Sequence, residues 1–182
     1  MGAYQLALVR LIESAEDVRQ LMLLTWTWPI AESVHFLGLT LLFGSIAAWD
    51  FRLLGVGRGV PIAAFHRLIP FAVIGFAVNV TSGIGFLMAE PAQYIYNPAF
   101  HLKMLLVVLG GVNVVVFYLT IFRRVRDLGP DAPAPPSARL AGAVSLACWM
   151  GVIVCGRMIT FYRPFPCRRG EPLGFLADCI MR

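Results

Sequence analysis

The chain has 182 residues, of which 59% are hydrophobic and only 14% are charged. Soluble domains carry roughly 25% charged residues, so this composition excludes an ordinary soluble protein and indicates an integral membrane protein. The formal net charge is +5. No nucleic-acid-binding module accompanies that charge, and membrane topology and lipid headgroups explain the basic residues better than nucleic acid does. At this length we expect one compact bundle.

Residues 1–27 are expected to form an amphipathic helix rather than a cleavable signal peptide. A signal peptide needs an uncharged core, yet Glu13, Glu16 and Asp17 lie in this stretch. Apolar or small side chains recur at helical spacing at Tyr4, Leu8, Leu11, Ala15, Val18 and Met22. We expect this helix to lie flat at the membrane interface or to cap one end of the bundle.

Four later stretches are each long enough to cross a bilayer, which takes about 20 apolar residues. They run from about residue 29 to 54, 65 to 89, 98 to 126 and 138 to 162. The prediction is an all-α integral membrane four-helix bundle over residues 28–163, followed by a basic C-terminal tail, 164–182. The tail holds Cys167 and Cys179, which are either free or paired in an oxidising compartment.

The short loops set the expected orientation. Arginines gather in the first and third loops, at Arg52, Arg58, Arg67, Arg123, Arg124, Arg126 and Arg139. The positive-inside rule places these loops in the cytoplasm, and both termini in the periplasm of a bacterial inner membrane. The arginines of the tail argue the other way, but charges in short loops weigh most. On the arginine-rich side, Asp50, Arg52, His66 and Arg67 are expected to anchor the spans at the interface.

Glu32 and His35 are the most informative polar residues, because they lie one helical turn apart inside the first span. Ionisable side chains are costly in hydrocarbon and by default mark a site. A spacing of three places both on one helical face. Glu32 could orient the imidazole or relay a proton, and His35 offers a nitrogen lone pair to a metal or to haem iron.

Polar groups of other spans reach the same end of the bundle, at His101, Lys103 and Arg157. Bundles build cofactor sites from such inward-facing side chains. His101 and Lys103 are about 200° apart around a helix, so both cannot face one pocket. His101 would complete a bis-histidine metal site with His35, whereas Lys103 would be a second ligand or pair with a cofactor carboxylate. Arg157 would neutralise propionates, pair with Glu32 or reach the headgroups.

Other chemistry is poorly supported by the sequence. Serine-nucleophile, phosphate-loop and dinucleotide motifs are not found. Asn79 and Asn113 lie in the middle of the second and third spans, where amides commonly hydrogen-bond across a bundle. We expect these two residues to hold helices together rather than to carry chemistry.

Three segments resemble the pattern of a bacterial family of small four-span membrane proteins with a domain of unknown function. They are W-P-x-x-E-x-x-H at 28–35, D-x-R-L-L-G at 50–55 and N-P-x-F-x-x-K at 97–103. A histidine early in the first span and a lysine opening a later one are distantly similar to HemJ-type protoporphyrinogen oxidases and copper-resistance D membrane proteins. This second resemblance implies that His35 and Lys103 handle b-type haem or a porphyrin.

We therefore expect a haem b protein, an oxidoreductase component, that transfers electrons between a membrane quinone or porphyrin and a partner. One alternative is an accessory subunit of a larger membrane complex, without a cofactor of its own. The expected protein partners are such a complex or further copies of the chain in a homo-oligomer. A second alternative is a copper or small-solute transporter with Glu32, His35 and either Met104 or Met158 as ligands. The sequence does not decide among these three.

Overall fold

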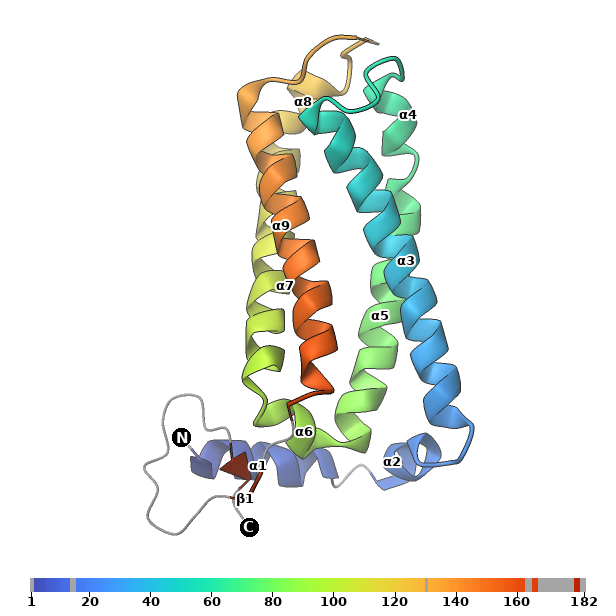
Figure 1. Cartoon of the computed structure of the whole chain (residues 1–182), viewed down its shortest axis with the longest axis vertical. Helices are drawn as coiled ribbons and strands as arrows, with labels where there is room; N and C mark the ends of the chain where they lie inside the picture. Colours follow the sequence, from blue (N-terminus) through green and yellow to red (C-terminus); the bar gives the residue numbers. More distant parts are fainter. Residues whose placement is uncertain (1, 14–15, 130, 163–164, 167–178, 181–182) are drawn as a thin grey trace.

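The structure is a computed structural model that describes residues 2–13, 16–129, 131–162, 165–166 and 179–180. Four long helices run along its longest axis (Figure 1): α3 (Thr27–Leu54), α5 (Ile69–Ala89), α7 (Pro98–Val116) and α9 (Pro136–Ile159). With the short helices that adjoin them, all four are long and apolar enough to cross a membrane. The predicted all-α membrane bundle is confirmed, and the predicted spans match the helices to within a few residues.

Short elements connect or extend the long helices. At one end of the bundle α4 (Ile62–His66) precedes α5, while η1 (Phe117–Ile121), a π-helical turn, and α8 (Phe122–Val125) continue α7. At the other end α6 (Pro91–Ile95) joins α5 to α7. These are called the α4–α8 end and the α6 end below. Two-residue strands β1 (Phe165–Pro166) and β2 (Cys179–Ile180) pair in parallel, and the question of a Cys167–Cys179 disulfide lies outside the described residues.

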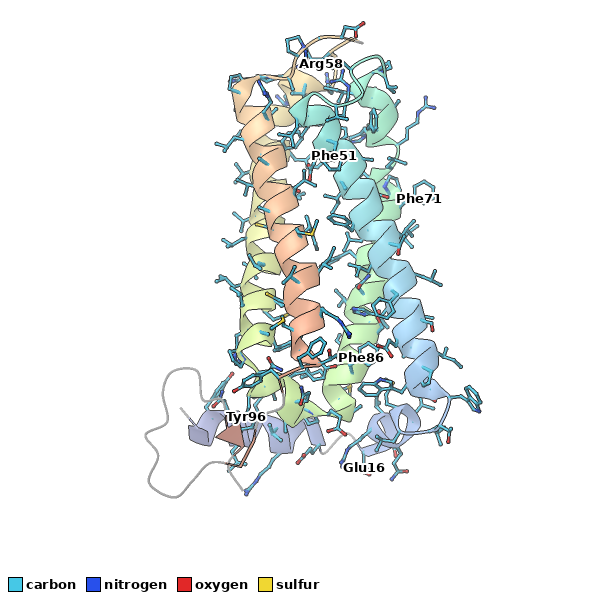
Figure 2. The ribbon with its side chains drawn as sticks, in the orientation of Figure 1. Glu16, Phe51, Arg58, Phe71, Phe86 and Tyr96 are labelled. Atoms are coloured by element: carbon cyan, nitrogen blue, oxygen red, sulfur yellow. The ribbon has the colours of Figure 1, made fainter. Side chains whose placement is uncertain are left out.

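The N-terminal segment forms two helices, α1 (Gly2–Glu13) and α2 (Glu16–Met22), instead of one helix from residue 4 to 22. Both lie across the α6 end of the bundle (Figure 1). Val9 of α1 packs against Ile95 and Tyr96, while Met22 of α2 packs against Phe86. Figure 2 labels Tyr96 and Phe86 at this end. The segment therefore caps the bundle, as one of the two expectations held.

Part of the predicted apolar stripe faces away from the bundle. Tyr4 is 71% exposed and Leu11 is 69% exposed. The face of α1 that packs inward carries Leu8 of that stripe together with Val9 and Ile12. Apolar side chains on the outer face of a helix that lies across a membrane protein's end suit the headgroup region of a bilayer. Capping and interfacial placement are thus compatible here.

The long helices pack as two pairs, α3 with α5 and α7 with α9, and α3 also packs against α9. The closest approach is at Gly75 of α5. A Cβ added there would lie 2.5 Å from the Leu42 nitrogen and 2.6 Å from the Gly38 oxygen of α3. Small residues let the backbones of membrane helices touch in this way. This contact holds α3 against α5 at a level between His35 and Asp50 of α3.

Hydrogen bonds between helices add to this packing. The Asn97 side chain accepts from the Ala99 N–H at 3.0 Å, which caps α7, and donates to the Ile159 and Tyr162 carbonyls at 3.2 Å. Asn113 of α7 donates to the Ala141 carbonyl of α9 at 3.1 Å, so its predicted cross-bundle hydrogen bond is confirmed. Asn79, by contrast, donates to a carbonyl of its own helix, that of Gly75, at 2.9 Å.

Two charged residues at the α4–α8 end are buried rather than interfacial. Arg52 is 1% exposed, and its Nε donates to the Val60 carbonyl at 2.8 Å, which fastens the loop after α3. Asp50 is 3% exposed. The expectation that these two side chains anchor the span at the interface is therefore wrong. His66 is partly buried too, and its Nε2 lies 3.2 Å from the Tyr118 hydroxyl.

Candidate cofactor site

His35 is held between α3 and α5 near the α6 end. Its Nδ1 lies 2.8 Å from the Ser82 hydroxyl oxygen. The Ser82 hydroxyl itself donates to the Val78 carbonyl at 2.6 Å, so its oxygen must accept from the imidazole. The neutral ring therefore carries its proton on Nδ1, which leaves the Nε2 lone pair available. Phe86 supports the ring edge-on, with 5.6 Å between ring centroids.

Lys103 of α7 reaches into the same part of the bundle from the opposite pair of helices. A Cβ on Gly156 of α9 would lie 3.8 Å from the Lys103 Nζ, so the ammonium lies against α9. Among the described residues, no carboxylate forms an ion pair with Lys103. A cation inside an apolar bundle is costly without a counter-ion. The site therefore suits an anionic partner.

In the described part of the chain Glu32 forms no hydrogen bond with His35, whose Nδ1 is hydrogen-bonded to Ser82. The Glu32 side chain is exposed at the α6 end. Burial, and then the charges of Glu32 and Glu90, raise the pKa of Tyr94 in α6 to about 12. The charge of Glu32 therefore acts on Tyr94 of α6. The residue that hydrogen-bonds to the His35 ring and orients it is Ser82 rather than Glu32.

His101 of α7 packs against its own helix. Its ring lies 6.2 Å from that of Phe100, centroid to centroid, and its Nδ1 is buried with no hydrogen-bond partner among the described residues. Lys103 is more deeply buried than His101, and residues two positions apart on a helix face different directions.

Arg157 is exposed on α9 near the same end. Its guanidinium carbon lies 4.7 Å from the centroid of the Phe161 ring, and its Nη1 is 3.4 Å from the Thr160 hydroxyl. Within the described ranges it forms no ion pair with Glu32. Of the five predicted site residues, His35 and Lys103 lie at least partly inside the bundle near the α6 end, whereas Glu32 and Arg157 are exposed there and His101 packs against Phe100.

The side chains of this site offer few metal ligands, so they suit a metal that already carries most of its ligands, as the iron of haem does. No group of three or more His, Cys, Asp or Glu side chains suited to a metal ion occurs in the part of the chain that the structure describes. Met104 is 38% and Met158 51% exposed, so both methionine side chains lie largely on the surface of the bundle. A haem iron needs only an axial imidazole nitrogen, and its propionates need a cation. His35 and Lys103 fit those two requirements.

Sequence reasoning missed Ser82, which orients the imidazole. The signal present was a small polar run, Thr81-Ser82-Gly83, inside an otherwise apolar span. Serine in a membrane helix usually bonds to its own backbone, as Ser82 does, and nothing local indicates that it also faces His35. Gly83 is small beside the same ring, since a Cβ there would lie 4.0 Å from the His35 Cε1.

Comparison of the chain with models of known protein families, with curated proteins and with solved structures finds no match. By its fold, the chain is a four-span membrane bundle with a histidine, His35, and a lysine, Lys103, partly buried near the α6 end.

Proposed function

We propose that this protein binds b-type haem in the bundle near the α6 end and transfers electrons between a membrane-soluble carrier, a quinone or porphyrin, and a partner protein. The observation that carries the proposal is the pairing of a lone-pair-bearing His35 Nε2 with a Lys103 ammonium that has no carboxylate counter-ion among the described residues. Haem iron, when bound, supplies the one-electron chemistry. The similarity to HemJ-type enzymes points in the same direction.

Each residue has a defined task in this proposal. His35 would hold the haem iron through Nε2, and Ser82 would keep the ring proton on Nδ1 and fix the plane of the ring, the kind of outer hydrogen bond that metal-bound histidines usually make. Lys103 would compensate the carboxylate of a haem propionate. Gly83 and Gly156 are the small residues nearest to the histidine and the lysine. Phe86 shields the ring from water.

The orientation is part of the proposal. Arginines at the α4–α8 end would face the cytoplasm of a bacterial inner membrane, and the α6 end would face the periplasm together with α1 and α2. The haem would then lie nearer the periplasmic surface. A periplasmic electron-transfer partner would approach the face on which α1 and α2 lie.

Absorption spectroscopy of three forms of the purified chain tests the proposal. Wild type should show a Soret band and a b-type pyridine haemochrome, and His35→Ala should lose both. His101→Ala is the matched control, because its imidazole lies at the same end but outside the site, and it should keep the wild-type spectrum. Equal spectra for His35→Ala and wild type would move the ligand elsewhere. A wild type without haem that co-purifies with a stoichiometric partner would favour the accessory-subunit alternative.

A further inference from the structure

A second polar site lies in the half of the bundle toward the α4–α8 end. A cavity of about 260 Å³ lies among α3, α5, α7, η1 and α9. Its walls reach from Leu42 to Leu53 on α3 and from Ile69 to Phe76 on α5. His35, Ser82 and Lys103 do not line it. The cavity is therefore distinct from the candidate cofactor site.

The cavity is walled by aromatic rings and opens toward lipid. Five of its lining residues are aromatic: Trp49, Phe76, Phe117, Tyr118 and Trp149. The lining residues at its outer edge belong to the exposed apolar surface, since Val73 is 62% and Val114 is 39% exposed. A flat, apolar molecule dissolved in the bilayer could enter between α5 and α7 at this edge. The π-helical turn contributes two of the rings, and such turns often accompany functional sites.

Two buried polar atoms of this wall have no hydrogen-bond partner among the described residues. They are the Asp50 Oδ2 and the Trp149 Nε1, on residues that are only 3% and 6% exposed. Ser145 of α9 lies beside the Asp50 carboxyl group, and Asp50 packs at the level of Gly142. The Trp149 Nε1 lies further along α9, 3.6 Å from a Cβ built on Gly110 of α7. Each unpartnered buried group costs about 1–3 kcal/mol, which a ligand could recover.

We propose that this cavity binds the ring of a quinone that carries an apolar tail. A ring carbonyl accepts the Trp149 N–H, a second ring oxygen meets the Asp50 carboxyl group, and the tail leaves between α5 and α7. The carboxyl group can donate to a quinone oxygen when protonated and accept from a quinol hydroxyl when ionised. The role of this ligand as an electron carrier rests on the proposed function, whereas its binding does not.

The chemistry of the wall favours a quinone over other membrane molecules. No lysine or arginine lines the cavity, so it offers nothing to the phosphate of a phospholipid. No histidine lines it either, so it provides no imidazole for haem iron. Its volume lies just under the range of about 300–1,000 Å³ that is usual for drug-sized ligands, which suits one ring with its tail outside. Two polar atoms in an aromatic wall match the oxygens of such a ring.

Quenching of tryptophan fluorescence by decylubiquinone, measured on the full chain in lipid nanodiscs, tests the proposal. Trp49 and Trp149 line the cavity, so a bound quinone should quench their emission saturably, while decylbenzene at equal concentration should not. Gly111 lines the cavity, and a Cβ there has no atom within 4 Å. Gly111→Phe should fill the space and weaken quinone binding by about tenfold or more.

Gly44→Phe is the matched control, because Gly44 has equally open surroundings and does not line the cavity. It should bind the quinone as wild type does. Asp50→Leu keeps a similar side-chain volume but removes both carboxyl oxygens, and should weaken binding by about fivefold, the value of one hydrogen bond. Quenching that never saturates, or equal affinity in wild type, Gly111→Phe and Asp50→Leu, would overturn the proposal. The haem content of the same wild-type preparation reports separately on the haem proposal.

Discussion

Gly75 lies where α5 touches the backbone of α3, and its replacement by alanine should push the two helices apart. A Cβ there would lie 2.5 Å from the Leu42 nitrogen, whereas ordinary Cβ contacts begin at 3.4 Å. The helices would have to separate by most of an ångström, and a gap of about 0.5–1 Å forfeits a quarter to a half of each dispersion contact. Overpacking of this kind costs about 1–3 kcal/mol.

Alanine also has a higher helix propensity than glycine, by about 1 kcal/mol, so the net loss for Gly75→Ala should be about 0–2 kcal/mol. Gly44→Ala is the control, because no atom lies within 4 Å of a Cβ at that position. It should be neutral or slightly stabilising. Unfolding in mixed detergent micelles containing SDS, followed by circular dichroism, measures both. Equal stability of the two variants would refute the close crossing of α3 and α5.

Three further predictions concern single residues. Ser82→Ala removes the acceptor of the His35 Nδ1–H and should speed haem transfer to apomyoglobin by about 10–100-fold; an unchanged rate would show that Ser82 does not orient the ligand. Lys103→Met removes the buried cation and should weaken haem retention, while Lys103→Arg should restore part of it; equal retention in both would exclude charge compensation. Asn97→Ala leaves the α7 cap and two α9 carbonyls without their partner and should lower the free energy of unfolding by about 2–4 kcal/mol, whereas a loss under about 0.5 kcal/mol would contradict its buried role.

The four spans could be predicted because hydropathy is a local property of each stretch, and proline marks the starts of α7 and α9. The convergence of His35 and Lys103 also followed from the order of the spans. The break of the N-terminal segment into two helices did not, because helical spacing of apolar residues continues through it. The choice of the packing face depended on α6, which is a tertiary partner.

The burial of Asp50 and Arg52 could not be predicted either. Both residues lie in the last turns of the first span, where charged side chains usually reach the interface. In the structure the loop after α3 folds back, so that the Val60 carbonyl meets the Arg52 guanidinium, while Ser145 of α9 meets the Asp50 carboxyl group. These partners are distant in sequence or lie across a turn. Only the packed bundle shows that a carboxyl oxygen is left over beside an aromatic cavity.

The ratio of haem to protein in wild type, purified in mild detergent after expression with a haem precursor, tests the histidine–lysine site most directly. A ratio close to one iron porphyrin per chain, with an imidazole-ligated spectrum, is the predicted result. A preparation that stays colourless and folded, and takes up no added hemin, would contradict the account.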